Sequence, residues 1–120
     1  MWRRMAALAA AIFIMMTEMG VSSDEITGVY AGVWYTVGVS CNNSSASGYA
    51  RYADTSKGLE LTVELIYEDY NGNKHIKTAK KSGTTYLTAQ TENGRYINQS
   101  TKTARATLYI AGYAISIEMN

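Results

Sequence analysis

A strict alternation of apolar and polar side chains over residues 59–68 constrains the fold of this chain more than any other feature. The apolar side chains occupy every odd position of this stretch: Leu59, Leu61, Val63, Leu65 and Tyr67. The even positions are polar except for Ile66. Because successive side chains of a β-strand point to opposite faces, the pattern predicts a strand with one buried and one solvated face.

The alternation belongs to a predicted hairpin over residues 59–78, with an Asn-Gly pair at its turn. Asn-Gly is the sequence most compatible with the two positive φ angles of a type I′ turn. A two-residue turn at this point pairs Tyr67 with Ile76 and Glu68 with His75. We expect the remaining strands to cover the apolar face of this hairpin.

The second strand of the hairpin, residues 74–81, is polar and rich in lysine. Only Ile76 and Ala79 are apolar in it. Lysine on an exposed strand discourages pairing with another chain. This strand is therefore predicted at the edge of a sheet.

About seven strands are predicted in all, separated by turns rich in Gly, Asn and Ser. Besides the hairpin they cover residues 27–40, 46–53, 84–91, 96–99 and 103–119. No helical period is evident after residue 23. The pattern favours an all-β fold, an antiparallel β-sandwich of immunoglobulin-like architecture, with a small closed β-barrel as the alternative. The Cys…Trp…Cys spacing of immunoglobulin domains is absent, so only the architecture is inferred.

Glycine interrupts two of these strands. Residues 27–40 are long for a strand, and Gly32 and Gly38 suggest a bulge or the close approach of a neighbouring chain segment. In residues 103–119 the apolar positions change from even to odd at Gly112. This change predicts a β-bulge, or a bend where the strand crosses between sheets.

The N-terminal residues 1–23 have the pattern of a helical secretory signal peptide. Arg3 and Arg4 precede a run of 11 apolar residues, 6–16, which is shorter than the roughly 20 residues of a membrane-spanning helix. We expect cleavage between Ser23 and Asp24, or alternatively after Gly20. The mature chain is then one domain, residues 24–120, secreted or at the cell surface, with no stable transmembrane span. The alternative is an apolar helix retained in the fold.

The charge balance and the cysteine content limit which partners and which disulfide bonds are expected. The 11 basic and 10 acidic residues nearly balance, so no nucleic-acid partner is expected. Cys41 is the only cysteine, which excludes an intrachain disulfide. We expect Cys41 to be a small buried apolar side chain, with an exposed thiol or an intermolecular disulfide as alternatives. The lack of cysteine pairs favours a bacterial exported protein.

The sequence contains no recognisable catalytic, cofactor or metal site. His75 is the only histidine, and Glu68 and Cys41 are its only suggested catalytic partners. No nucleophile motif accompanies them, so we expect no catalytic residue and no enzyme activity. Residues 69–73 resemble the start of a calcium loop, but the glycine spacing is wrong and a hairpin turn explains them. No cofactor is expected.

Aromatic and lysine side chains on polar strand faces form the candidate binding surface. Its members are Tyr30, Trp34, Tyr49, Tyr86, Tyr96, Tyr109, Lys74, Lys77 and Lys80. Exposed aromatic rings can stack on sugars or pack against a protein. The alternative is that the tyrosines stabilise the sheet through cross-strand packing and that the lysines keep an edge strand soluble.

Three functions remain open at this stage. The first is a non-catalytic binding protein whose partner is a protein or a carbohydrate. The second is a self-associating subunit of an extracellular filament or matrix, because the strands are rich in Thr, Tyr and Val and the chain has no proline. The third is a small secreted hydrolase that uses His75.

Overall fold

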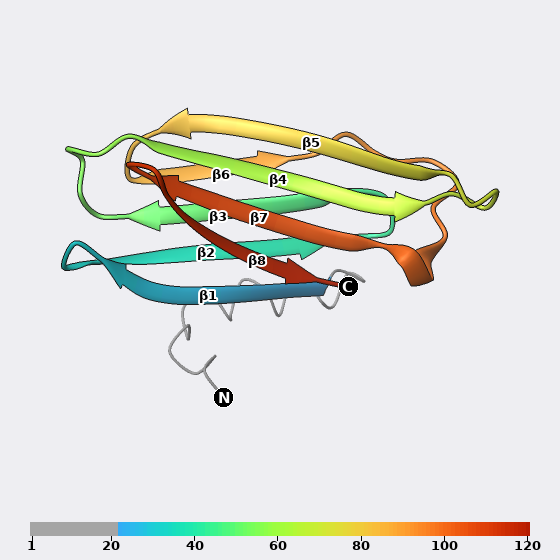
Figure 1. The fold of residues 1–120 in the computed structure, drawn as a ribbon, viewed down its shortest axis with the longest axis horizontal. Helices are drawn as coiled ribbons and strands as arrows, with labels where there is room; N and C mark the ends of the chain where they lie inside the picture. Colours follow the sequence, from blue (N-terminus) through green and yellow to red (C-terminus); the bar gives the residue numbers. More distant parts are fainter. Residues whose placement is uncertain (1–21) are drawn as a thin grey trace.

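The computed structural model describes residues 22–120, which form eight strands in two antiparallel sheets (Figure 1). The strands are β1 Ser22–Tyr30, β2 Val33–Cys41, β3 Ala46–Tyr52, β4 Leu59–Glu68, β5 Lys74–Gly83, β6 Tyr86–Gln90, β7 Thr103–Ile110 and β8 Tyr113–Met119. The predicted signal peptide lies outside the described residues except for its last two positions, which begin β1. No helix in the described part is long and apolar enough to cross a membrane.

Each sheet has four strands. Sheet A has the order β1-β2-β3-β6, and sheet B has the order β5-β4-β7-β8. Across the molecule β1 faces β8, β2 faces β7, β3 faces β4, and β6 faces β5. Because neither sheet closes on itself or on the other, the fold is consistent with a sandwich, and the closed-barrel alternative is wrong.

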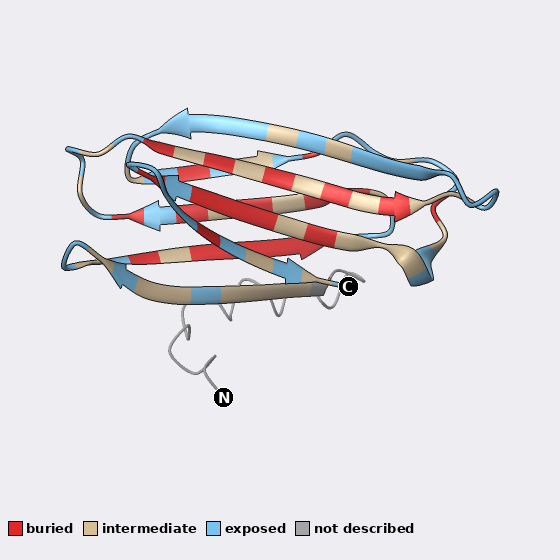
Figure 2. Ribbon diagram, in the orientation of Figure 1, coloured by how far each residue is buried: buried red, intermediate tan, exposed pale blue. Residues whose placement is uncertain are grey.

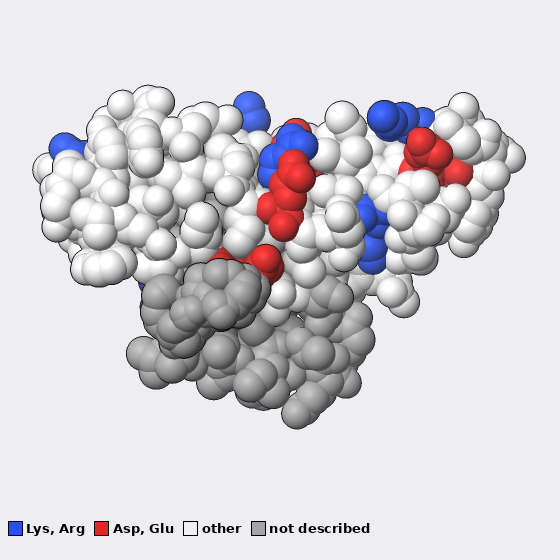
Figure 3. Space-filling model, turned by 60° about the horizontal axis from the view of Figure 1, so that its bottom comes forward, with Lys and Arg blue, Asp and Glu red and all other residues white. Residues whose placement is uncertain are grey.

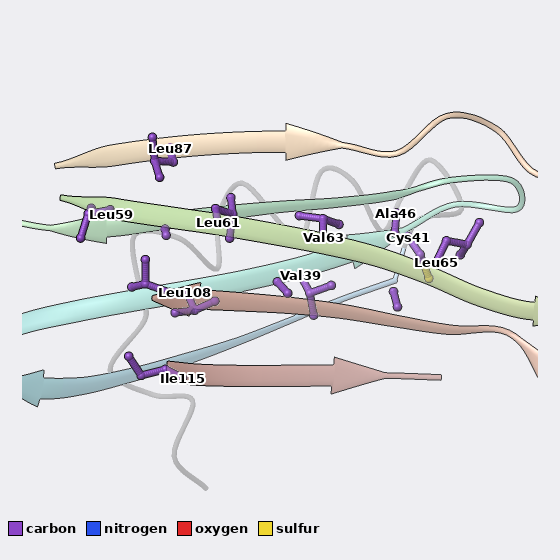
Figure 4. Close-up of a cluster of buried hydrophobic side chains, with 14 of the residues drawn as sticks. Val39, Cys41, Ala46, Leu59, Leu61, Val63, Leu65, Leu87, Leu108 and Ile115 are labelled. Carbon is purple, nitrogen blue, oxygen red and sulfur yellow. The ribbon is translucent and has the colours of Figure 1, made fainter. Parts of the chain in front are cut away.

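The predicted alternation in β4 is confirmed and supplies the centre of the core. Leu61, Val63 and Leu65 are fully buried, while the even positions of β4 are only half-buried (Figure 2). Their side chains meet those of Val39 and Cys41 from sheet A between the layers (Figure 4). Burying one such leucine contributes about 1.5–3 kcal/mol. Cys41 is a free thiol with 5% of its surface exposed, as expected for a small apolar core residue.

The prediction of one long strand over residues 27–40 is wrong. Ala31 and Gly32 form a two-residue turn between β1 and β2, with φ angles of 52° and 79°. Two positive φ angles in a two-residue hairpin loop are the mark of a type I′ turn. Sheet A therefore begins with a hairpin, and the strand count is eight rather than seven.

The prediction of a bulge or bend at Gly112 is wrong for the same reason. Ala111 and Gly112, with φ angles of 49° and 88°, form the turn between β7 and β8. Ile110 pairs with Tyr113 across it. Paired residues share a face of the sheet, so a two-residue turn moves the apolar positions from even to odd numbers. The change of the apolar positions from even to odd numbers is therefore caused by a hairpin turn.

The predicted hairpin between β4 and β5 is confirmed, but its turn type and register are wrong. Only Gly72 has a positive φ angle in this turn, 84°. The Gly72 N–H donates to the Asp69 carbonyl (3.0 Å), and the Asp69 N–H donates to the Asn73 carbonyl (2.9 Å). This is a three-residue loop in which a type I turn precedes a left-handed glycine.

The longer loop shifts β5 by one residue against β4. Tyr67 pairs with His75, and Glu68 pairs with Lys74, in place of the predicted Tyr67–Ile76 and Glu68–His75 pairs. Ile76 thereby lies on the outer face of sheet B and is 56% exposed. The predicted edge position of β5 is confirmed.

The return strand predicted over residues 96–99 is also wrong. Ile97 forms one isolated bridge with Asp69, and a 3-10 turn follows at Gln99–Thr101. The Gly94 N–H donates to the Ser44 carbonyl (2.8 Å) rather than closing a hairpin. Ile97 is only 4% exposed. This connection from β6 to β7 covers one end of the core instead of extending a sheet.

Candidate functional site: the outer face of sheet A

The antiparallel register of sheet A sorts its outward side chains into rows that cross the strands. One row contains Thr27, Thr36, Arg51 and Tyr86; the next contains Glu25, Gly38, Tyr49 and Thr88; a third contains Ser23, Ser40, Ser47 and Gln90. Trp34, at the start of β2, faces the same side. Two tyrosines, a tryptophan and an arginine thus share one face, although they come from three different strands.

Arg51 lies beside two neighbouring tyrosine rings. Its Cζ is 5.9 Å from the ring centroid of Tyr49 and 5.4 Å from that of Tyr86, and the two centroids are 6.4 Å apart. These distances are within the range of cation–π attraction. Within residues 22–120 no carboxylate forms an ion pair with Arg51. The guanidinium is therefore held against aromatic rings without a direct ion pair, although the charge of Glu25 is close enough to interact with it.

A groove of about 490 Å³ runs along this face beside Arg51. It is lined by small residues, including Gly38 and Ser40, and by Tyr49 and Tyr86. A Cβ atom at position 38 would collide with the Tyr49 ring, so glycine allows that ring to lie on the strand. The volume is within the range of about 300–1,000 Å³ typical of small-ligand sites.

The far side of the groove is formed by β5 of the other sheet. Lys80 and Lys81 line it beyond the edge strand β6. Both lysines are exposed, and neither forms an ion pair among the described residues. The groove therefore has basic side chains on two of its sides.

A second, shallower hollow of about 440 Å³ adjoins the first and shares Arg51 and Tyr86 with it. Trp34 lines this hollow and is 64% exposed, while Tyr86 is 51% exposed. We call the combined surface the aromatic-basic face. It consists of Trp34, Tyr49, Arg51, Tyr86, Lys80 and Lys81.

A strained turn places Tyr86. The Tyr86 N–H donates to the Thr84 carbonyl (2.7 Å), which closes a γ-turn around Thr85, whose φ angle is 62°. A β-branched residue rarely adopts a positive φ angle. The Thr85 carbonyl accepts from the Tyr52 N–H (2.8 Å), which fixes the turn to the end of β3. The strained residue, Thr85, thus directly precedes β6 and orients its first residue, Tyr86.

Glu25 is the acidic side chain in the rows of this face. Burial raises the pKa of its carboxyl, whereas the nearby positive charge of Arg51 acts in the opposite direction. Neither carboxyl oxygen of Glu25 forms a hydrogen bond within the described part of the chain. The electrostatic balance of the face is one partly buried carboxyl against one arginine and two lysines.

The structure brings four of the nine predicted surface residues together: Trp34, Tyr49, Tyr86 and Lys80. Arg51 was missed by sequence reasoning, which weighed aromatic residues and the lysine-rich strand. The available signal was its spacing, because residues 49 and 51 share a face of the same strand.

The other five predicted residues lie elsewhere. Tyr30 stacks on Tyr113, with ring centroids 4.8 Å apart, where the β1–β2 and β7–β8 turns meet. Tyr109 lies on the outer face of sheet B, and Tyr96 lies in the loop between β6 and β7. In the backbone register of β4 and β5, Lys74 lies opposite Glu68 and Lys77 lies opposite Leu65. These five residues do not extend the aromatic-basic face.

On the outer face of sheet B, the one arginine is neutralised by two carboxylates. Arg105 donates to Glu64 (3.0 Å) and to Glu118 (2.6 Å), joining three neighbouring strands. In the view of Figure 3, basic and acidic atoms adjoin at the centre of the molecule, next to a broad area that has neither. Ion pairs of this kind hold a sheet together but leave little charge for a ligand.

His75 does not join a nucleophile. Its Nε2–H donates to Asp69 Oδ2 (2.9 Å), and its ring stacks on Tyr67 with centroids 5.1 Å apart. Cys41 lies in the core. Among the described residues no group of three or more His, Cys, Asp or Glu side chains could hold a metal ion.

The fold and this face together define an all-β protein of two antiparallel four-stranded sheets with a grooved, aromatic and basic surface on one of them. No protein-family model matches the chain, and no curated protein or solved structure matches it either.

Proposed function

We propose that this is an exported, non-catalytic β-sandwich protein that binds a carbohydrate through the aromatic-basic face. The observation that carries the proposal is the pair of exposed rings, Trp34 and Tyr86, on either side of Arg51 beside a groove. Large aromatic side chains exposed together mark interaction surfaces more often than inert ones. The expected place of action is at or outside the cell surface.

A sugar suits this surface better than a flat protein epitope does. The C–H faces of a sugar ring stack on aromatic rings, and its hydroxyl groups need polar partners around them. The groove supplies such partners from the exposed side chains of Thr88 and Gln90. A protein partner, which usually requires a patch of about 800 Å² on each side, is the alternative that the test addresses.

Export rests on the charged and apolar character of residues 1–23. Cleavage after Ser23 removes two residues of β1 and leaves Asp24, which pairs with Val39, at the new N-terminus. Cleavage after Gly20 keeps every pair between β1 and β2. The intact mass of the exported protein distinguishes the two, and an uncleaved intracellular chain would contradict export.

The immunoglobulin likeness is proposed for the layered architecture alone. In an immunoglobulin constant domain the sheets contain strands ABED and CFG, so the third strand has already changed sheets. Here the first three strands remain in sheet A. The two folds therefore share face-to-face packing, while their connections differ.

The test is binding to a glycan array by the wild-type chain and two matched variants. Tyr86→Ala should reduce the bound signal about tenfold, because one base-sized stacking contact contributes about 1–3 kcal/mol. Tyr109→Ala, which removes a partly exposed tyrosine from sheet B, should leave binding unchanged. A blank array with folded wild-type protein, or an equal loss in both variants, would rule out this function.

Self-association remains the second candidate because the two sheets have free edges. In the described part β8 pairs only with β7, and its residues include no lysine. Unprotected edges can pair with another copy of the chain. Sedimentation as a monomer at high concentration would exclude an assembling subunit.

A further inference from the structure

We propose that the saccharide bound by the aromatic-basic face is anionic, a sugar carrying carboxylate or sulfate groups, with Arg51 as its main anchor. This inference rests on the proposed carbohydrate function and specifies its ligand class. Three features carry it: a guanidinium with no ion pair in the described part, two lysines that line the same groove, and the contrast with Arg105 on sheet B.

Arg51 has the properties of an anion-binding arginine. A guanidinium offers paired N–H donors that match a carboxylate or a sulfate. Arg105 donates its N–H groups to Glu64 and Glu118, whereas Arg51 makes no ion pair within residues 22–120. The guanidinium donors of Arg105 are thus occupied by carboxylates, whereas Arg51, beside the groove, forms no ion pair in the described part.

The rings of Tyr49 and Tyr86 hold the guanidinium in place before a ligand arrives. Their centroids lie 5.9 and 5.4 Å from its Cζ. Restricting an arginine in advance reduces the conformational entropy lost on binding, which costs about 0.5–1.5 kcal/mol per mobile side chain. A sugar ring stacked against Tyr86 would bring an exocyclic acidic group within reach of Arg51.

The lysines make the groove positive although the whole chain is nearly neutral. Lys80 and Lys81 line the groove from β5, and neither has an acidic partner in the described part. Glu25 is the acidic residue on this face, and burial raises the pKa of its carboxyl. A concentration of like charges in a groove favours ligands of the opposite charge and speeds their association.

The experiment is calorimetric titration of the full chain with three oligosaccharides of matched length: a uronic-acid oligomer, a sulfated oligomer and a neutral glucose oligomer. At least one acidic oligomer should bind ten times or more tighter than the neutral one. High salt should weaken that binding, because it screens exposed charges. The tighter of the two acidic ligands identifies the anion.

The variants separate charge from structure. Arg51→Gln should lower affinity for the acidic oligomer about tenfold or more, as expected for a lost charged hydrogen bond. Arg51→Lys should recover part of that loss, because a point charge remains without the paired donors. Lys74→Gln, at the opposite end of β5 from Lys80 and outside the groove lining, is the control and should change nothing. If Arg51→Gln does not fold, the Lys80→Gln/Lys81→Gln double variant provides the same comparison.

The outcomes for the two proposals differ. Equal binding of neutral and acidic oligomers, or an equal effect of Arg51→Gln and Lys74→Gln, would overturn the anionic ligand and leave the carbohydrate function intact. Failure of every saccharide to bind the folded chain would overturn both.

Discussion

Asp69 holds the β4–β5 turn with both oxygens of its carboxylate. Oδ1 accepts from the N–H groups of Asn71 (2.8 Å) and Asn73 (3.0 Å), and Oδ2 accepts from His75 (2.9 Å). These bonds favour the charged carboxylate, led by the one from His75, and lower the pKa of Asp69 to about 2. In the residues that suggested a calcium loop, the Asp69 carboxylate therefore forms its hydrogen bonds within the turn itself.

The stability of this turn should depend on pH. Because the folded pKa of Asp69 is below the unfolded value, its contribution is complete above pH ~4 and is lost as the pH falls toward 2. An NMR titration should place the Asp69 carboxyl midpoint at about 2. His75→Phe keeps a ring beside Tyr67 and removes the hydrogen bond, so the midpoint should rise. An unchanged midpoint in that variant would contradict the assignment of cause.

Within residues 22–120, two Ala-Gly pairs form type I′ turns, whereas neither Asn-Gly pair does. Ala31 and Ala111 have positive φ angles, a conformation that costs an alanine about 1–2 kcal/mol. Asn71 has no positive φ angle, since its turn has three loop residues. The local sequence preference of type I′ turns would have placed them at the Asn-Gly pairs and not at the Ala-Gly pairs. The pairing of apolar faces in the two sheets overrides it.

Turn substitutions should show this difference. Ala31→Asn and Ala111→Asn should each raise the free energy of unfolding by about 1 kcal/mol, because Asn tolerates the left-handed region. Asn71→Ala should have little effect, while Gly72→Ala, at a φ angle of 84°, should destabilise. Urea denaturation measures all four. A loss of stability in both alanine-to-asparagine variants would argue against type I′ turns at these positions.

At the scale of the whole molecule, the two sheets are held by one shared apolar layer. Fully buried side chains from sheet A and sheet B face one another along its length, among them Val37, Val39, Leu61 and Leu108. With no disulfide available to the single Cys41, this layer supplies the packing that stabilises the described domain. The outer faces of the two sheets can then differ in charge pairing: Arg105 on sheet B forms two ion pairs, and Arg51 on sheet A forms none in the described part.

Truncating a side chain in the core should lower the free energy of unfolding strongly, whereas truncating one on the outer face should change it little. Leu61→Ala should lower the free energy of unfolding by about 2–5 kcal/mol, because it leaves a cavity at a site with no exposed surface. Thr62→Ala, the next residue on the outer face, should change it by about 0.5 kcal/mol. Thermal or urea denaturation compares them. Similar losses in both variants would mean that β4 does not separate a core face from a solvent face.

Part of the candidate site was predictable and part was not. Trp34, Tyr49 and Tyr86 stood out as aromatic side chains on polar faces, and such a residue can be assigned to a face from sequence alone. Arg51 could have been joined to Tyr49 by its two-residue spacing, but neither could be joined to Tyr86 or Lys80, since β3 and β6 meet only through pairing across the sheet and β5 belongs to the other sheet. Long-range register, which single-strand patterns do not contain, assembled the groove.

The alternation of apolar residues by itself determined that this chain folds into strands and which face of β4 is buried, and the lysine-rich composition of residues 74–81 determined that β5 lies at an edge. Each of these depends on neighbouring side chains within one strand, where the geometry is fixed. The tertiary structure alone decided the number of strands, the turn types, the one-residue shift of β5 and the meeting of Arg51 with two tyrosines. Those features depend on which distant segments pair, and that choice is made by burying the most apolar surface between two sheets.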